Sequence, residues 1–225
     1  MGCMAEKKAF LGLISKRERY GLTLRGYIII AGMTIVLLIL VVGYLYPFLA
    51  VSDPVAGDIM VVEGWVPCYA IERAVHDFKK EDYKLLVTTG VPFGIGSPLR
   101  RYGTSAELAA SCVRSMGIDE ERVVAVSTPD VKRNRTYESA IQLKEWLKSK
   151  GLKIKALNIY TLGPHARRTR MLYMYVFAPD VEVGIIAVNS KDYEPNRWWT
   201  YSSGVRQVLD EAIAYLYAKF FFYPD

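Results

Sequence analysis

The hydrophobic positions of the chain form one long run, followed by short runs that alternate with amphipathic segments. The long run covers residues 27–50 and is almost uncharged. An α-helix needs about 20 apolar residues to cross the hydrocarbon core of a bilayer, and the apolar core of a signal peptide has only about 7–15. The run therefore predicts one uncleaved transmembrane helix at 27–50.

The shorter apolar runs have the length of buried strands. They lie at 59–62, 85–89, 123–126, 154–161 and 181–188. Helical spacing of apolar positions follows each of them, at 68–80, 104–116, 135–150, 164–177 and 205–221. Apolar strands that alternate with helices are typical of a parallel sheet covered on both faces. We predict a Rossmann-like, doubly wound α/β domain at 58–225, with a mostly parallel sheet of about five strands.

The uneven distribution of charge predicts the orientation of the chain. Residues 1–26 carry six Lys and Arg and two Glu, which is +4 of the formal net charge of +6. Basic flanks stay on the cytoplasmic side of a membrane. We therefore predict a cytoplasmic tail at 1–26, a short linker at 51–57 and an extracytoplasmic, periplasmic domain held close to the lipid bilayer of the inner cell membrane. Because the excess basic charge lies mainly in the tail, we do not expect nucleic-acid binding.

Polar residues follow the predicted strands, at the edge where such sheets bind ligands. Glu63 ends the first strand, where a carboxylate is costly without a partner, and we predict that it is a base or binds a polar substrate group. The segment after the fourth strand places His165 beside Arg167, Arg168 and Arg170 at a helix start. Helix N-termini and guanidinium groups both favour anions. This segment predicts a phosphate or carboxylate site, with a solvated basic first turn as the alternative.

Two further arginine pairs follow the second and third strands. They are Arg100 with Arg101 and Arg133 with Arg135. Because guanidinium groups match the geometry of phosphate, three clusters on one rim predict a phosphorylated ligand. We expect about half of these arginines to face solvent or lipid headgroups instead.

Two other patterns have structural alternatives. Glu107 is a candidate catalytic residue, but Thr104 and Glu107 also have the spacing of a helix capping box. The two histidines and the spacing of the cysteines predict no metal site, and the cofactor is unknown. We expect Cys112 to be packed in the core as a free thiol, and a disulfide between Cys68 and Cys112 stays open.

Residues 57–223 resemble the YdcF-like family, a widespread bacterial domain of unknown function. An apolar strand leads into Glu63 and Gly64, and the fourth strand ends in Thr161 before a His-x-x-Arg sequence at 165–168. Segments 104–107 and 136–138 resemble two more family motifs, although Ser139 stands where Asn is usual. We predict His165, Glu63 and Glu107 as catalytic residues, and a ligand-binding set of Gly64, Gly90, Thr104, Arg135, Thr136, Glu138, Thr161, Arg167 and Arg168.

The resemblance implies a polar pocket in a Rossmann-like fold. It also links members with an N-terminal anchor to cell-envelope integrity and to lipid carriers of peptidoglycan or polysaccharide. We therefore expect an envelope protein that binds or acts on a phosphate-bearing ligand, with a lipid-linked glycan as the leading candidate. One alternative is a non-catalytic factor that uses Trp198, Trp199 and residues 220–223 for protein or membrane contacts. Another is a nucleotide- or S-adenosylmethionine-binding domain, as one soluble relative implies. Catalysis and oligomeric state stay open.

Overall fold

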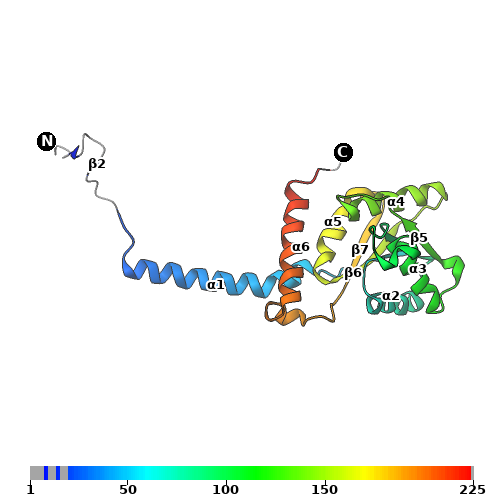
Figure 1. The fold of residues 1–225 in the computed structure, drawn as a ribbon, viewed down its shortest axis with the longest axis horizontal. Coiled ribbons are helices and arrows are strands. Elements are labelled where there is room, and N and C mark those ends of the chain that lie inside the picture. Colours follow the sequence, from blue (N-terminus) through cyan, green and yellow to red (C-terminus); the bar gives the residue numbers. More distant parts are fainter. Residues whose placement is uncertain (1–7, 10–13, 16–19, 224–225) are drawn as a thin grey trace. The chain divides into compact units, whose positions relative to one another are not determined.

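The computed structural model describes residues 8–9, 14–15 and 20–223. The chain divides into two compact units, residues 1–41 and residues 42–225. The first unit contains the antiparallel pair β1 (Lys8–Ala9) and β2 (Ile14–Ser15) and most of helix α1 (Leu24–Leu49) (Figure 1). Much of the predicted basic tail lies outside the described residues.

Helix α1 matches the predicted apolar run to within three residues at either end. Its most apolar 18-residue window has a mean hydropathy of 2.8, and none of that window is buried. Among the described residues, it is the one helix that is long and apolar enough to cross a membrane. A signal sequence near an N-terminus has the same properties, so the uncleaved anchor and its orientation stay predictions.

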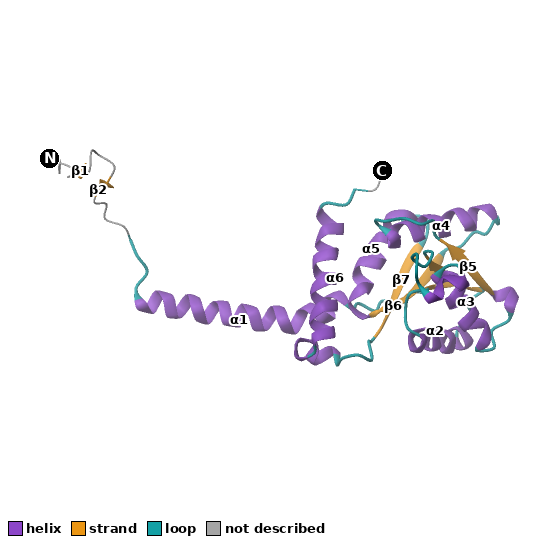
Figure 2. Ribbon diagram, in the orientation of Figure 1, coloured by secondary structure: helices purple, strands orange, loops and turns teal. Residues whose placement is uncertain are grey.

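The second unit is built on a five-stranded sheet in which every strand is parallel to its neighbours (Figure 2). The order of the strands is β5-β4-β3-β6-β7, so the chain starts in the middle of the sheet, moves outward, and then returns to the other side of β3. This order confirms the predicted doubly wound α/β fold. The strands are β3 (Ile59–Glu63), β4 (Leu85–Gly90), β5 (Val123–Ser127), β6 (Ala156–Leu162) and β7 (Glu182–Val188).

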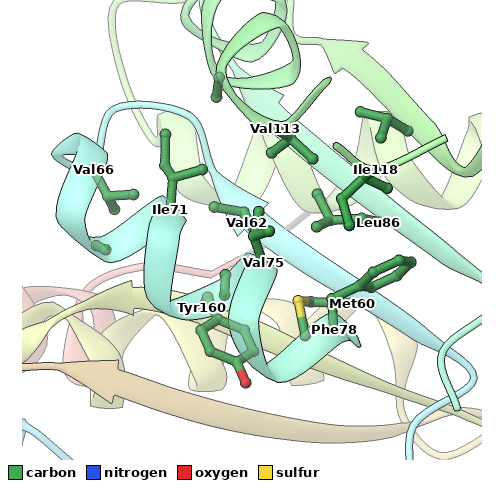
Figure 3. Packing of buried hydrophobic residues seen from close by; sticks show 14 of the residues in the cluster. Met60, Val62, Val66, Ile71, Val75, Phe78, Leu86, Val113, Ile118 and Tyr160 are labelled. Carbon is green, nitrogen blue, oxygen red and sulfur yellow. The ribbon is translucent and has the colours of Figure 1, made fainter. Parts of the chain in front are cut away.

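Two helices cover each face of the sheet. Helices α2 (Cys68–Lys80) and α3 (Ser105–Ser115) pack on one face, and α4 (Arg135–Ser149) and α5 (Ala166–Phe177) pack on the other. Successive side chains of a strand point to opposite faces, so a strand between two helical layers is apolar at most positions on both faces. The core beneath α2 and α3 includes Met60, Val62, Phe78, Leu86 and Val113 (Figure 3).

A third apolar cluster joins the end of α1 to the last helix, α6 (Ser202–Phe220), and to the short helix η4 (Pro195–Thr200). The indole Nε1 of Trp198 donates a hydrogen bond to the Val42 carbonyl at 3.1 Å. The last turns of α1 are therefore part of the second unit. The buried members of this cluster are Tyr46, Leu49, Tyr193, Trp198, Val208 and Tyr215.

The predicted linker at 51–57 is held against the sheet. Asp53 and Ile185 exchange backbone hydrogen bonds of 2.8 and 3.1 Å, and the side chain of Asn158 both accepts from and donates to the backbone of Val55. This segment therefore fixes the start of the domain to β6 and β7.

The element boundaries differ from the sequence predictions by a few residues. Gly163–His165 forms a 3₁₀ turn (η3) before α5, and α6 begins at Ser202 instead of 205. Two other short 3₁₀ helices, η1 (Pro98–Tyr102) and η2 (Glu120–Arg122), lie in segments predicted as loops. Such single turns carry too few residues to show a hydrophobic period.

Candidate functional site

The candidate site is a pocket at the carboxyl ends of the central strands. Its volume is about 460 Å³. Strands β3 and β6 are neighbours whose following helices pack on opposite faces of the sheet, and this switch point is where open α/β sheets bind ligands. The ends of β3 and β4, the N-termini of α3 and α4, and one side of α6 all contribute lining residues.

His165 is the centre of the polar wall of the pocket. It lies in η3, directly after β6, and only 6% of its surface is exposed. Its Nδ1 lies 2.8 Å from Oε1 of Glu211 on α6. Its Nε2 lies 3.5 Å from Oε1 of Glu63, which is an ion-pair contact longer than a normal hydrogen bond. Nε2 therefore has no hydrogen-bond partner within the described part of the chain.

The carboxylates of Glu63 and Glu211 determine whether His165 is charged. Burial alone lowers the pKa of the imidazole, but the nearby charges of Glu63 and Glu211 and the hydrogen bond with Glu211 outweigh burial and raise the pKa to about 9. Burial alone raises the pKa of Glu211, but His165 and Arg168 outweigh it and lower the pKa to about 2. At neutral pH the imidazole is therefore a cation between two carboxylates.

Glu63 is held in place from the opposite side. It is the last residue of β3, it is buried, and its Oε2 accepts a hydrogen bond from the hydroxyl of Thr161 on β6. Its Oε1 faces His165. Glu63 therefore has the partners that a buried carboxylate requires, and it lines the candidate pocket. Its role as a base or as a ligand for a substrate group stays a prediction.

Arg168 orients the same group of side chains. Its Nε and Nη2 lie 2.9 and 3.1 Å from the two carboxylate oxygens of Glu211, which is a bidentate pair. Its Nη2 also lies 2.9 Å from Nδ1 of His165. Nδ1 donates its proton to Oε1 of Glu211, and Nη2 of Arg168 donates to the same oxygen. The contact between Arg168 and His165 is therefore a close approach of two donors that share one acceptor.

The start of α4 brings basic residues to the pocket. The N-terminus of α4 lines the pocket through Asn134, Arg135 and Thr136, preceded by Lys132. Asn134 has a positive φ of 56°, and within the described chain its side chain does not cap the helix. The side chain of Asn134 therefore leaves the N–H groups of Arg135 and Thr136 uncapped. The pocket lining holds four cationic groups against two carboxylates, a net charge of +2; the cations are Lys132, Arg135, His165 and Arg168.

The remaining wall is apolar and aromatic. Trp65, which follows β3, makes an edge-on contact with the His165 ring at a centroid distance of 5.0 Å. Helices α5 and α6 and the segment after α6 contribute Leu172, Ala214, Tyr217, Ala218 and Phe222. A ligand in this pocket would therefore meet cations on one side and an apolar surface on the other.

Two predicted glycines allow α3 to approach the ends of the strands. A Cβ atom on Gly64 would lie 2.4 Å from the Ser105 carbonyl oxygen, and one on Gly90 would lie 2.8 Å from the Ala106 nitrogen. Both positions therefore need glycine for packing. Gly90 also lines the pocket.

Thr104 and Glu107 form the capping box of α3. The Thr104 N–H donates to Glu107 Oε2 at 2.8 Å, and the Glu107 N–H donates to Thr104 Oγ1 at 3.1 Å. Neither residue lines the pocket. The structural alternative accounts for both residues, and nothing in their placement supports a catalytic role for Glu107.

The arginine clusters do not converge as expected. Of the cluster at the start of α5, only Arg168 lines the pocket. Arg167 donates to the Phe48 carbonyl and lies over the Phe48 ring, 4.0 Å from its centroid. Arg170 pairs with Asp53 at 2.7 Å. Two of the three therefore hold the end of α1 and the following segment.

The other two arginine pairs are divided as well. Arg135 lines the pocket, while Arg133 lines a second, more open pocket together with Glu138. Arg100 and Arg101 are exposed on η1 and line neither pocket. Apart from Arg168 and His165, the cationic residues that line the pocket therefore lie at or just before the start of α4, where the sequence had favoured the start of α5.

Sequence analysis had not placed Glu211, Trp65 or Lys132 among the site residues. Glu211 is separated from His165 by 46 positions and sits in a helix that otherwise looks like a covering element. The one available signal was an acid among apolar residues on α6. Cys68 and Cys112 are both free thiols, and within the described residues no cluster of His, Cys, Asp and Glu could hold a metal ion.

No protein-family model and no curated protein matches the sequence. The resemblance to the YdcF-like family stays a prediction.

Proposed function

We propose that the pocket binds a phosphate-bearing ligand. The observation that carries this proposal is the buried Nε2 of His165, which has no hydrogen-bond partner among the described residues. His165 itself lines a pocket whose lining has a net charge of +2. A buried donor without a partner is costly, and a ligand oxygen would satisfy it. The phosphate would contact the N–H groups at the start of α4, Lys132 and Arg135.

The same geometry supports acid–base chemistry on the bound ligand. His165 is protonated at neutral pH, and its Nε2 can donate a hydrogen bond or a proton to a ligand oxygen. Glu63, whose Oε1 lies 3.5 Å from Nε2, lines the same pocket and can accept a proton from a water or a ligand hydroxyl. Glu211 holds the imidazole through Nδ1, and Arg168 holds Glu211 through a bidentate pair, so both act as positioning residues.

The apolar wall and the N-terminal helix favour a lipid-linked ligand in the cell envelope. Trp65, Tyr217 and Phe222 can cover an apolar chain or a sugar face next to the phosphate. An uncleaved α1, with the basic tail in the cytoplasm, would hold the domain outside the membrane next to such lipids. A polyprenyl phosphate or its glycan-bearing diphosphate has this combination of anion and apolar tail.

Binding measurements on the full chain in detergent micelles test the proposal. The ligands are inorganic phosphate, a sugar phosphate, a nucleotide and a polyprenyl phosphate. We expect polyprenyl phosphate to raise the unfolding temperature most, because a bound ligand stabilises the folded state. We expect the Lys132→Gln, Arg135→Gln double variant to lose about 10-fold or more in affinity, since charge-assisted hydrogen bonds contribute about 1.5–3 kcal/mol each.

Arg100→Gln is the matched control, because Arg100 is exposed and does not line the pocket. Its affinity should equal that of the wild type. If none of the four ligands shifts the unfolding temperature, or if Arg100→Gln weakens binding as much as the double variant, the pocket is not the phosphate site.

A further inference from the structure

Helix α6 carries an exposed apolar face that the fold does not use. Leu209, Ile213, Leu216 and Phe220 recur at intervals of four, three and four residues, which places them on one side of the helix. Their exposed fractions are 44%, 68%, 51% and 55%. Such a contiguous row differs from single exposed apolar residues, which are common on protein surfaces.

Other residues of α6 contact the rest of the domain or line the pocket. Val208 and Tyr215 belong to the cluster that packs on the end of α1, and Glu211 and Ala218 line the pocket. The exposed face is therefore a second surface of the same helix. We propose that this face, formed by Leu209, Ile213, Leu216 and Phe220, docks onto the bilayer surface at which α1 emerges.

The length of α1 identifies the bilayer as the occupant. Arg25 is the last charged residue before the apolar run, and about 20 helical residues cross the hydrocarbon core. When α1 spans a membrane, residues 42–46 therefore lie close to the far hydrocarbon boundary. Trp198 donates to the Val42 carbonyl, and Phe48 makes an edge-on contact with Tyr215 of α6 at 5.6 Å. These contacts hold η4 and α6 beside the last turns of α1, close to that boundary.

The residues around the exposed face suit a lipid headgroup region. Trp199, Tyr217 and Phe221 are exposed near it, and aromatic side chains concentrate at membrane interfaces. Arg206 lies on the same side, one turn before Leu209, and can reach lipid phosphates. Asp210 is exposed at the edge of the face. The charged residues around the apolar face therefore include both an acid and a base.

Depth-dependent quenching in proteoliposomes tests the docking. The full chain, with Cys3, Cys68 and Cys112 replaced by Ser, is reconstituted in vesicles of phosphatidylethanolamine and phosphatidylglycerol. A fluorophore is attached in turn at Ile213→Cys, at Phe220→Cys and at Lys148→Cys, an exposed position on α4. Lipids with a nitroxide high on the acyl chain should quench positions 213 and 220 several-fold more strongly than position 148.

A second variant separates docking from folding. Ile213→Glu with Leu216→Glu changes only exposed side chains, so the unfolding temperature should stay the same while the fluorophore at 220 loses its quenching. Equal quenching at 213, 220 and 148 would overturn the proposal. So would contact of position 213 with a second copy of the chain in place of lipid. This experiment contains no phosphate ligand beyond the bilayer itself, so its result is independent of the proposed binding pocket.

Discussion

His165 is the residue on which the chemistry of the pocket depends, because two carboxylates keep its buried imidazole charged. A buried cation is stable only when it is paired. Nε2 lies in the ion pair with Glu63 but has no hydrogen-bond partner among the described residues. It can therefore donate to a ligand without the imidazole first having to gain a proton. Three predictions about individual residues follow from this arrangement.

Replacing Glu211 by Gln should lower the pKa of His165 below 9, because the imidazole loses a charge partner. In ¹H–¹⁵N NMR of the full chain in micelles, the titration midpoint of His165 should move toward the ordinary value of 6.5. We also expect a loss of about 3–5 kcal/mol in the free energy of unfolding, since a buried ion pair is broken. Glu120→Gln, at an exposed acid, should change stability by less than about 1 kcal/mol. An unchanged midpoint in Glu211→Gln would contradict the assigned contact.

The ion cluster should stabilise the fold most between pH 4.5 and 6.5. The pKa of His165 rises from 6.5 to about 9 on folding, so its contribution is complete below pH 6.5 and is lost as the pH rises through 9. The pKa of Glu211 falls from 4.5 to about 2, so its contribution is complete above pH 4.5 and is lost as the pH falls through 2. Thermal unfolding across this range should show the optimum, and a His165→Gln, Glu211→Gln variant should have a flatter profile.

Phosphate affinity should have its own pH limit. We expect affinity to hold between about pH 7 and 8 and to fall as the pH rises through about 9, where His165 loses its proton. Titration calorimetry at a series of pH values measures this limit. In the His165→Gln variant, the loss of phosphate affinity near pH 9 should be absent. If that variant loses affinity at the same pH, a group other than His165 causes the loss.

Among the elements, the close approach of α3 to the strand ends depends on glycine. Gly64→Ala should destabilise the domain by about 1–3 kcal/mol, because its Cβ would lie 2.4 Å from the Ser105 carbonyl oxygen. Gly94→Ala is the matched control, since no atom lies within 4 Å of a Cβ at that position. Chemical denaturation of both variants measures the difference. Equal stabilities would show that α3 can shift away from β3 without cost.

Helix α5 shows why an element can be predicted correctly while its role is not. The apolar spacing gave its end at Phe177, and the His165 position was found from the strand that precedes it. The direction in which Arg167 points depends on the end of α1, because its guanidinium contacts the carbonyl and the ring of Phe48. No local pattern contains that contact, because 119 positions separate the two residues.

At the scale of the whole molecule, an uncleaved α1 should anchor the chain with its domain outside the cytoplasm. An alkaline phosphatase fusion at the C-terminus should be active in a bacterial host, and a cytoplasmic reporter at the same position should be inactive, because basic flanks stay inside. The chain should also stay in the membrane fraction after alkaline washing. Release by the wash at the size of a cleaved product would instead identify α1 as a signal sequence.

The sequence by itself determined the order of the elements and the fold class, because the periods of buried strands and amphipathic helices are local properties of the chain. It also pointed to Glu63 and His165 as candidate site residues, because residues at or just after the ends of parallel strands lie at the same edge of the sheet. Only the tertiary structure decided that Glu211 completes the ion cluster, that α4 supplies the basic wall, and that α6 leaves one face exposed. These features depend on distances between residues far apart in the chain, and no local pattern encodes those distances.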